Sequence, residues 1–410
     1  MDGKADDADG NFRALIFALL ALACGHMLST LLRTIPAVSL DVMAADFQTA
    51  PQKLASLTSV YHFAFAASQI PVGAAMDRFG VRPVSLSLLA GTIVGALASG
   101  LASGIESFVF AQMMLGVATS GMLMCPMTLA AKQMSAARFG LWSGIILSLG
   151  NIGMLLSASP LAWVVENFGW RAGFWISAGF GAAVALAVFV LVPSQPAEQV
   201  DRGSPLSQMG EVLRIGLSRP LRGLIALALV SLAVSLVLRG LWGGPWLMEV
   251  KGLSRIEAGN VLGLFTLALI IAPALIGLLD RRFGHRREVL AAMHSLAALL
   301  LAVMAAGAPH FPLSDWLGVA SLSSRADAAL FVLIGIAVSA QPLLYGMTRQ
   351  LVDAQNAGKA LSAINLAFFL GTALMQSVTG VVAGTFGLPA VLLFIAASLI
   401  VGIIVFLMYT

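Results

Sequence analysis

Two arginines occupy segments that are otherwise apolar. Arg33 lies in ACGHMLSTLLRTIPAVSLDVMAADF, and Arg239 lies in ALVSLAVSLVLRGLWGGPWLMEV. An arginine on an isolated helix at the centre of a bilayer costs about 3 kcal/mol on insertion scales. A guanidinium can recover this cost by binding a phosphate, carboxylate or similar oxyanion through paired, charge-assisted hydrogen bonds. The alternative is that each arginine neutralises an acid such as Asp41 or Glu249, or extends to the membrane surface.

Four other side chains are candidate substrate ligands. His26 precedes Arg33 by seven residues and shares its helical face, so it can hydrogen-bond a substrate or titrate during transport. Tyr61 and His62 bring polarity to a second apolar segment, and Tyr345 does so in a later one. The competing interpretation is that each makes an interhelical hydrogen bond, which is the commoner role of such residues in membranes.

Long apolar helices must position these side chains. The 410 residues are 59% hydrophobic and only 10% charged, whereas soluble domains carry about 25% charged residues. A spanning helix needs about 20 apolar residues. We therefore predict an all-α membrane protein with twelve transmembrane helices. The predicted spans cover residues 14–44, 54–76, 81–102, 105–130, 139–163, 171–192, 221–249, 256–280, 287–307, 327–351, 358–384 and 388–409.

Polar segments divide these spans into two groups of six. The acidic start, MDGKADDADGN, predicts a disordered cytoplasmic tail over residues 1–13 rather than a cleaved signal peptide. A six-helix bundle is expected over 14–192, a cytoplasmic linker over 193–220 and a second bundle over 221–410. With the N-terminus inside, sixteen Lys and Arg residues fall on the inner side and five on the outer side. This bias places both termini in the cytoplasm of a bacterial-type inner membrane.

The two bundles carry an internal repeat. The segment Gly73 to Arg82 recurs as Gly277 to Arg286, 204 residues later, and Arg33 and Arg239 differ by a similar 206 residues. Repeated halves place a substrate near the membrane midplane, at the interface between them. The repeat therefore predicts that Arg33 and Arg239 contribute to one site.

The repeated loop resembles the signature of the major facilitator superfamily, G-x-x-x-D-R-x-G-x-R. The matching residues are Gly73, Asp77, Arg78, Gly80 and Arg82. This resemblance implies two pseudo-symmetric six-helix bundles that rock about a central site. It also implies a gating role for the loop, which in that family packs against neighbouring helix ends on the cytoplasmic face. The second copy is shifted, because its acid, Asp280, comes one residue early.

The segment that follows Arg239 is similar to the seventh helix of the organophosphate:phosphate antiporters, which include carriers of glycerol 3-phosphate and hexose phosphates. In that family one arginine of the first helix and one of the seventh bind the phosphoryl group. The resemblance implies that Arg33 and Arg239 do the same here. We thus predict a monomeric secondary active transporter for a small organic anion or organophosphate, with a counter-anion or proton as the coupled solute.

Three other functions are ranked below anion transport. Copper or another soft metal is possible because Met122, Met124, Cys125 and Met127 cluster in the fourth span, although methionine also fills gaps in apolar cores. Nitrate or nitrite transport has weak support from Gly150 to Gly153. Drug export lacks the arginine typical of the fourth span, where Gln112 stands.

No enzyme motif is present. The sequence contains no phosphate-binding P-loop, HExxH or nucleophile elbow. It predicts no cofactor, resident metal or nucleic-acid partner, and no disulfide because Cys24 and Cys125 both fall in predicted spans.

Overall fold

A computed structural model describes residues 2–194, 205–353 and 356–410, and these ranges contain helices and connecting turns but no strand. The protein is an all-α membrane protein with a twelve-helix architecture. Part of the predicted linker, residues 195–204, lies outside the described residues.

The first half contains nine α-helices and one 3₁₀ turn. Gly80 and Gly169 separate consecutive helices with φ values of 84° and 78°, which glycine adopts without the steric cost of a Cβ. α1 begins at Asp2, so its first turns fall in the segment that the sequence predicts as a tail. The elements are α1 (Asp2–Thr34), η1 (Ile35–Val38), α2 (Leu40–Asp46), α3 (Pro51–Phe79), α4 (Val81–Gly100), α5 (Ile105–Thr119), α6 (Met124–Gln133), α7 (Ala136–Leu156), α8 (Ser159–Phe168) and α9 (Trp170–Leu191).

The linker and the second half follow the same plan. The elements are α10 (Pro205–Gly216), η2 (Arg219–Leu221), α11 (Arg222–Val237), η3 (Leu238–Trp242), α12 (Gly243–Pro245), η4 (Trp246–Val250), α13 (Arg255–Phe283), α14 (Arg286–Ala306), α15 (Pro312–Trp316), α16 (Ser324–Val338), α17 (Leu343–Gln350), α18 (Ala357–Phe386) and α19 (Leu388–Tyr409). η3 and η4 are π-helical turns, which are rare and often occur at functional sites.

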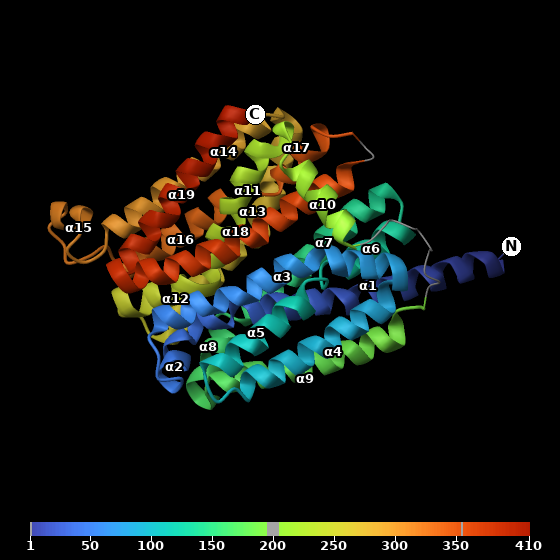
Figure 1. The fold of residues 1–410 in the computed structure, drawn as a ribbon, viewed down its shortest axis with the longest axis horizontal. Helices are drawn as coiled ribbons and strands as arrows, with labels where there is room; N and C mark the ends of the chain where they lie inside the picture. The colour runs from blue at the N-terminus through green and yellow to red at the C-terminus, as the bar shows by residue number, and fades with distance from the viewer. Residues whose placement is uncertain (1, 195–204, 354–355) are drawn as a thin grey trace.

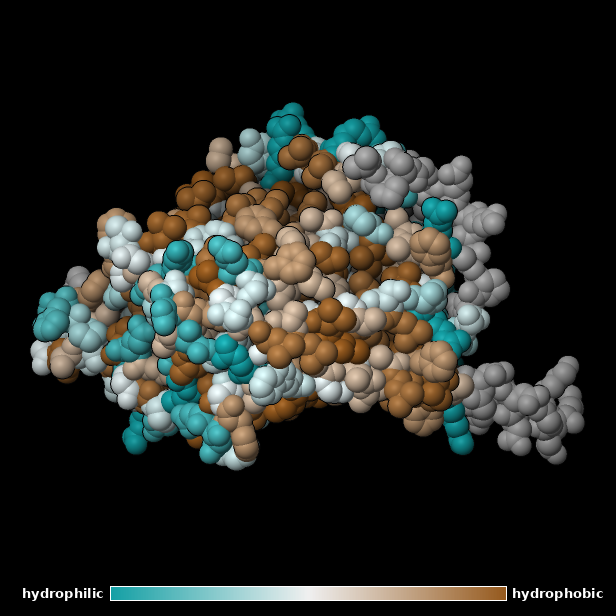
Figure 2. Space-filling model, turned by 60° about the horizontal axis from the view of Figure 1, so that its bottom comes forward, coloured by the Kyte–Doolittle hydropathy of each residue, from teal (hydrophilic) through white to brown (hydrophobic). Residues whose placement is uncertain are grey.

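Within the described residues, eleven segments are long and apolar enough to cross a membrane. α3 has the necessary length, 29 residues, but polar side chains such as Thr58, His62 and Gln69 interrupt it. These three side chains are buried in the protein, so α3 crosses the membrane without exposing them to lipid. Figure 2 shows apolar side chains over the middle of the visible face and hydrophilic side chains gathered toward the ends.

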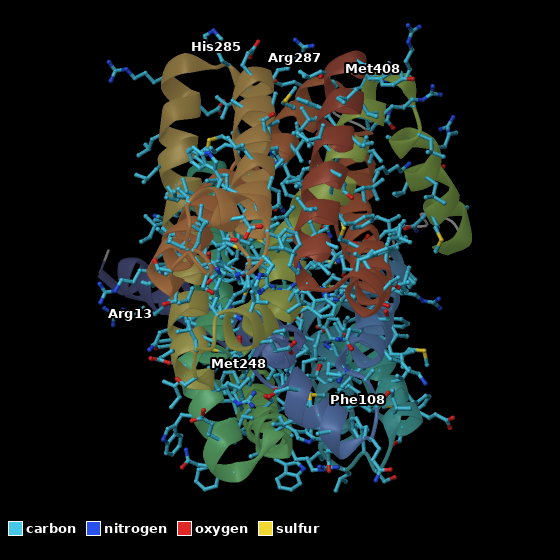
Figure 3. All side chains as sticks on the ribbon, turned by 90° about the vertical axis from the view of Figure 1, so that its left-hand side faces the viewer. Arg13, Phe108, Met248, His285, Arg287 and Met408 are labelled. Carbon is cyan, nitrogen blue, oxygen red and sulfur yellow. The ribbon has the colours of Figure 1, made fainter. Side chains whose placement is uncertain are left out.

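The two halves meet at one end of the molecule and diverge toward the other (Figure 1). We call the end with Gly80, Gly284 and Tyr409 the terminal face, and the end with Gly169 and Gly252 the opposite face. Figure 3 shows His285, Arg287 and Met408 together at the terminal face. At the opposite face, η1 packs against η3 and α12, and α8 packs against α13.

Several spans are broken partway along. α5 gives way to α6 around Ser120–Leu123, and α16 gives way to α17 around Ser339–Pro342. Pro342 is the last residue of the second break, and Pro126 lies in the first turn of α6 after the first break. Proline lacks the N–H that a continuous helix would use. Discontinuous helices at the midplane expose backbone and side-chain polar groups to a substrate.

Candidate substrate site

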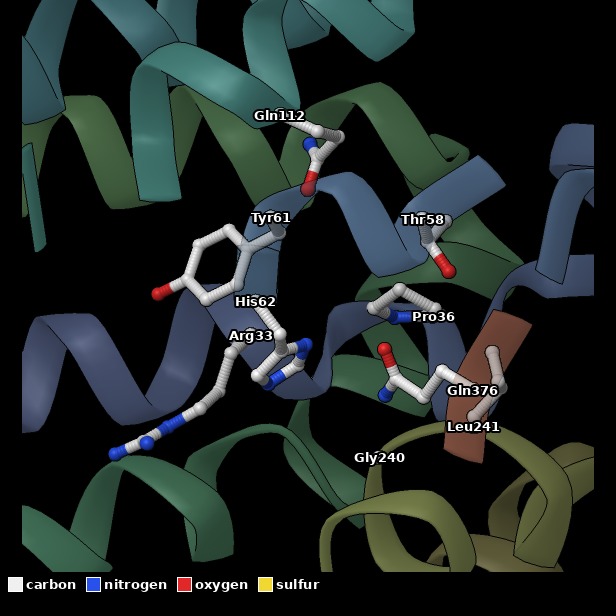
Figure 4. Close-up of a pocket in the computed structure, with 9 residues that line it drawn as sticks. All are labelled: Arg33, Pro36, Thr58, Tyr61, His62, Gln112, Gly240, Leu241 and Gln376. Atoms are coloured by element: carbon white, nitrogen blue, oxygen red, sulfur yellow. The ribbon is translucent and has the colours of Figure 1, made fainter. Parts of the chain in front are cut away.

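A pocket lies between the two halves, beside Arg33. In this conformation the pocket is small, with room for about one water molecule. Figure 4 shows side chains from α1, α3, α5 and α18 arranged around it, with the backbone of η3 on one side. The lining residues are Arg33, Pro36, Thr58, Tyr61, His62, Gln112, Gly240, Leu241 and Gln376. Both halves of the repeat thus contribute to a single pocket.

Arg33 is the only charged residue of this lining. Its Nε atom is buried and has no hydrogen-bond partner, and its guanidinium carbon lies 5.9 Å from the centroid of the Phe369 ring. In Figure 4 the side chain extends back toward the N-terminal end of α1, as helix geometry favours. Asp41, one of the acids that could have neutralised Arg33, pairs instead with Arg255. One donor of this cationic group, Nε, is therefore unused in the structure.

Neutral polar groups complete the pocket. Neither ring nitrogen of His62 has a hydrogen-bond partner, nor does Oε1 of Gln376, and all three atoms are buried. Figure 4 shows the His62 ring and the Gln376 amide facing one another across the pocket. Tyr61 differs, because its hydroxyl shares a 2.6 Å hydrogen bond with Thr119. Buried polar atoms without partners are costly in an apolar medium, and these three all belong to residues that line the pocket.

Arg239 has a different environment. It is 0% exposed and lies outside the pocket lining. Its Nε donates to Thr266 at 2.8 Å, and one Nη donates to the Met154 carbonyl and, at 3.1 Å, to Ser157. Ser157 also shares a 2.5 Å hydrogen bond with Thr34. Arg239 therefore joins the second half to α7 of the first half in this conformation.

His26 and Tyr345 also lie outside the lining of this pocket. A Cβ added to Gly150 would collide with the His26 ring, so the histidine packs closely on α7. Thr30, one turn later, donates to the Gly150 carbonyl. This face of α1 is turned toward α7, whereas Arg33 faces the pocket. Of the six predicted substrate ligands, the structure brings together Arg33, Tyr61 and His62.

Tyr345 belongs to a separate polar chain. Its hydroxyl donates to Oδ1 of Asn365 at 2.9 Å, and Nδ2 of Asn365 donates to Oε1 of Gln69. Gln69 is on α3 and Asn365 on α18, so this chain of hydrogen bonds crosses between the two halves.

An ion pair fastens the halves together at the opposite face. Arg255 makes two hydrogen bonds of 2.7 and 2.8 Å to the Asp41 carboxylate and one to the Val38 carbonyl. Partial burial alone would raise the pKa of Asp41, but the hydrogen bonds and positive charge of Arg255 outweigh it and hold the pKa below the usual value. Nearby, Ser159 donates to Asn260 at 2.5 Å. We call Asp41, Arg255, Ser159 and Asn260 the opposite-face latch.

A second buried charge cluster stabilises the end of the seventh span. Lys251 Nζ lies 3.3 Å from the Asp327 carboxylate, and the two side chains are 1% and 0% exposed. Trp246 donates to the same carboxylate at 2.8 Å, while Lys251 also donates to the carbonyls of Gly307 and Leu322. These bonds tie η4 to the loop before α16.

The two copies of the predicted gating loop make different contacts. Arg82 donates to the Phe189 carbonyl at 2.6 Å, at the end of α9, where a cation complements the helix dipole. Gly73 lies close to Met124 of α6, and Gly80 provides the turn between α3 and α4. In the second copy, Arg286 instead binds Asp280 of its own turn through bonds of 2.9, 3.0 and 2.9 Å. The one-residue shift in the sequence thus accompanies a different charge network.

The sulfur-containing residues of the fourth span lie among packed helices. Met122 is close to Gly25 of α1, and Cys125 Sγ lies 3.6 Å from Met76 Sδ. In the part of the chain that the structure describes, no three His, Cys, Asp or Glu side chains are grouped as metal ligands would be. Packing accounts for the positions of these sulfur atoms.

Sequence reasoning assigned no binding role to Gln112, Gln376 or Thr58. A usable signal exists for one of them, because Thr58, Tyr61, His62 and Gln69 recur along α3 at helical spacing and mark a polar face. Gln112 and Gln376 lie on helices far apart in the sequence, so only the fold reveals that they share a pocket.

Comparison with known proteins identifies a family. The model of the Major Facilitator Superfamily matches residues 22–324 and 244–410. The tetracenomycin C resistance and export protein of Streptomyces glaucescens is 26% identical, over 87% of this chain and 74% of its own length. The probable nitrate/nitrite transporter NarK2 of Mycobacterium tuberculosis is also 26% identical, over 58% of this chain and 59% of its own.

Solved structures support the same architecture. The nucleoside transporter NupG superposes with a TM-score of 0.76 at 14% identity, covering 96% of this chain and 99% of that structure. A POT family transporter in complex with 5-aminolevulinic acid gives a TM-score of 0.78 at 14% identity, covering 97% and 96%. At such identities the likeness concerns the fold alone.

Proposed function

Because the chain belongs to the major facilitator superfamily, we propose that this transporter moves a small anionic solute across the inner membrane by secondary active transport. The family and the relatives are transporters rather than enzymes. One observation carries the proposal of an anion: the partly unsatisfied Arg33 guanidinium borders a pocket that contains no acidic residue among its lining. An ionisable group at this depth is retained at a cost that ligand binding would justify.

Arg33 is the primary anchor in this proposal, and Tyr61 and His62 contribute neutral contacts. Arg239 is already engaged with Thr266, Met154 and Ser157. Its Nη1 has no partner, but Arg239 lies outside the pocket lining, so it would reach the anion only after the two halves rearrange. The organophosphate:phosphate antiporter resemblance, in which both arginines bind the substrate together, remains a prediction about that later state.

The distribution of positive charge supports one orientation of the molecule in the membrane. The terminal face carries most of the Lys and Arg residues, so we place it and both termini in the cytoplasm. The opposite face then lies outside, where the opposite-face latch holds the halves together. The structure corresponds to an inward-facing state in this assignment. Transport would proceed by breaking the latch and closing the terminal face, where the loop Gly73, Asp77, Arg78, Gly80 and Arg82 would stabilise the alternative state.

Two modes of coupling fit this site, anion exchange and proton-coupled transport. In this proposal the protein acts as a monomer. Nitrate and nitrite, which name one relative, are anions, but 26% identity over part of the chain does not transfer a substrate. The chemical class of the anion must therefore come from a binding experiment on this protein.

The test is a thermal-shift screen of the purified full chain against phosphate esters, carboxylates, nitrate and inorganic phosphate. A ligand present at one hundred times its Kd stabilises the folded state by about 2.7 kcal/mol. At least one anion class should raise Tm in the unmodified protein and fail to do so in Arg33→Met. Arg349→Met is the matched control, because Arg349 is an exposed arginine at the terminal face. Failure of every anion class to raise Tm, or anion binding that survives the loss of Arg33, would refute the proposal.

A further inference from the structure

The linker helix α10 leaves an apolar edge uncovered by protein. Met209, Leu213 and Leu217 follow one another every four residues, so they lie along one edge of the helix. The backbone N–H of Leu217 donates to the Leu213 carbonyl at 2.9 Å, which carries the helical geometry one residue past Gly216. Leu213 and Leu217 are 45% and 67% exposed.

The rest of the helix surface has a different character. Val212 and Gly216 are buried, and α10 packs against α18 of the second half and α3 of the first. Ser207, Glu211 and Arg214 are exposed and form a polar edge on the other side of the buried stripe. An exposed surface that is apolar along one edge and polar along the other suits a helix lying in the interface between membrane and water.

The position of α10 places its apolar edge at the start of the membrane spans, near the terminal face (Figure 1). Lys359, close to the start of α18, donates to the Glu211 carboxylate. A Cβ added to Gly216 would lie 3.0 Å from the side chain of Ala363, which is inside the membrane span that α18 forms. From Lys359 to Ala363 the helix rises about 6 Å. The C-terminal end of α10 therefore reaches a depth at which lipid surrounds an exposed apolar side chain.

The charges beside this edge are positive. Arg214, Arg219 and Arg222 are all exposed, and Glu211, which Lys359 binds, is the only acid between residues 205 and 221. Arg222 also donates to the Leu217 carbonyl at 3.1 Å and so closes the turn after α10. Each Lys or Arg near an anionic membrane surface strengthens binding by about fivefold.

We infer that α10 is an interfacial helix that binds anionic phospholipids in the leaflet at the terminal face. Leu213 and Leu217 insert at the boundary between headgroups and acyl chains, and Arg214 and Arg219 bind the lipid phosphates. The inference does not depend on the transported solute. Because α10 contacts both α3 and α18, bound lipid would hold the linker at the seam between the two halves.

The test uses the full chain in lipid nanodiscs, with a bimane fluorophore on Leu217→Cys in a background without Cys24 and Cys125. Brominated lipids quench a fluorophore that they touch, so brominated phosphatidylglycerol and brominated phosphatidylcholine are compared over the same range of mole fractions. Both should quench the label, and phosphatidylglycerol should associate about fivefold or more tightly. A label on Ser207→Cys, on the polar edge, should be quenched less than half as strongly. The two arginines are intact in these comparisons, so they do not depend on the folding of an arginine variant.

A double variant identifies the groups that select the lipid. Arg214→Gln with Arg219→Gln should reduce the preference for phosphatidylglycerol to less than twofold, while the Leu217→Cys label stays quenched by both lipids. Lys53→Gln with Arg325→Gln is the matched control, because it removes two exposed charges from the opposite face, and it should leave the preference unchanged.

Three results would overturn the inference. Absence of quenching at Leu217→Cys would show that the apolar edge faces water or another protein. Equal quenching by the two lipids in the chain with its arginines intact would show membrane contact without selection of anionic headgroups. A preference that persists in the arginine double variant would assign lipid binding to other basic residues. The thermal-shift screen for the solute anion has a different readout, so its failure would leave this result unaffected.

Discussion

Arg33 and Arg239 are related by the internal repeat, yet the structure gives them opposite environments. Arg33 borders a pocket, with its Nε unpaired and no acid in the lining. Arg239 is completely buried, with bonds to Thr266 in its own half and to Met154 and Ser157 in the other. Each arginine keeps one buried nitrogen without a partner, Nε of Arg33 and Nη1 of Arg239. The difference is that Arg33 borders the pocket, whereas Arg239 bridges the interface between the halves.

The two arginines also differ in their local backbone. The first span is α-helical through Thr34 and then tightens into a 3₁₀ turn, whereas the seventh span is π-helical from Leu238 to Trp242. A π-helical turn contains an extra residue and rotates the side chains that follow it relative to an α-helix. Side chains at equivalent positions of the repeat can therefore point in different directions.

The largest difference should appear in transport itself. In proteoliposomes, Arg33→Ala should reduce uptake of the anion that gives the strongest thermal shift by at least about 100-fold, because loss of a charge-assisted pair costs about 3 kcal/mol or more. Arg33→Lys should also be impaired if the anion requires two parallel N–H donors. Initial uptake rates measure the effect, with Arg349→Ala as the exposed control.

If Arg33→Ala retained normal uptake while Arg239→Ala lost it, the assignment of Arg33 as the anion ligand would be wrong. Equal losses in both variants, each with unchanged folding, would instead favour a site in which the two arginines act together on one anion.

Arg239→Met should alter the balance of conformations more than ligand affinity. It removes two hydrogen bonds between the halves, and bonds from charged groups contribute about 1.5–3 kcal/mol each. A shift of about 2 kcal/mol would change the ratio of the two states by about thirtyfold. Spin labels at Ala45→Cys and Arg325→Cys, both exposed on the opposite face, report the separation of the halves in a background without Cys24 and Cys125. The variant should show a longer, broader distance distribution.

An unchanged distribution in Arg239→Met, combined with weaker anion binding, would show that Arg239 belongs to the substrate site instead. Met154 is a poor choice for the reciprocal experiment because its contribution is a backbone carbonyl. Ser157→Ala is suitable, because it removes the Ser157 hydroxyl that Arg239 and Thr34 share, and it should produce a smaller shift in the same direction.

Much of this comparison could be anticipated from the sequence. The low fraction of charged residues indicated a membrane protein, and the recurrence of Gly73 to Arg82 indicated two related halves, in agreement with the family match and the fold. Arg33 was recognisable because a charge in an apolar segment needs a reason. These features depend on composition and spacing, which a linear sequence records directly.

Other parts depended on contacts between distant segments. Nothing in the sequence specified that Asp41 would pair with Arg255, more than two hundred residues away, or that Gln112 and Gln376 would meet at one pocket. The orientation of Arg239 required knowledge of the π-helical turn, and local sequence does not predict such turns well. The predicted grouping of His26 with Arg33 relied on a seven-residue spacing, but the face of α1 that carries His26 packs on Gly150.

A smaller effect concerns the opposite-face latch and pH. Because Arg255 holds the pKa of Asp41 below its usual value, the ion pair contributes fully above the unfolded pKa of about 3.9 and is lost as pH falls through the lower folded pKa. The latch should therefore be insensitive to pH between about 5 and 8 and weaken only below about pH 4. A partly exposed pair contributes about 1 kcal/mol or less. The ratio of the latched to the open conformation should therefore change by up to about fivefold.

The same spin-label distance measures this shift. Asp41→Asn removes the charge at every pH and should reproduce the acid distribution at pH 7, without further change on acidification. A transition centred near pH 6 in the unmodified protein would contradict this assignment and would point to a histidine, such as His26, as the group that controls opening.

The smallest expected effect distinguishes Tyr345 from the pocket residues. Tyr345→Phe removes one hydrogen bond, of about 1 kcal/mol, from the chain that runs through Asn365 to Gln69. The ring itself stays packed against Phe368. If Tyr345 stabilises the contact between α3 and α18 and does not touch substrate, the variant should lower Tm slightly and leave the KM for the transported anion within about twofold. Tyr61→Phe is the matched change inside the pocket, and it should raise the KM for the anion beyond the twofold limit expected for Tyr345→Phe. A large rise in KM for Tyr345→Phe would mean that the second half contributes a substrate contact from α17, so that the asymmetry between the two halves would be confined to their arginines.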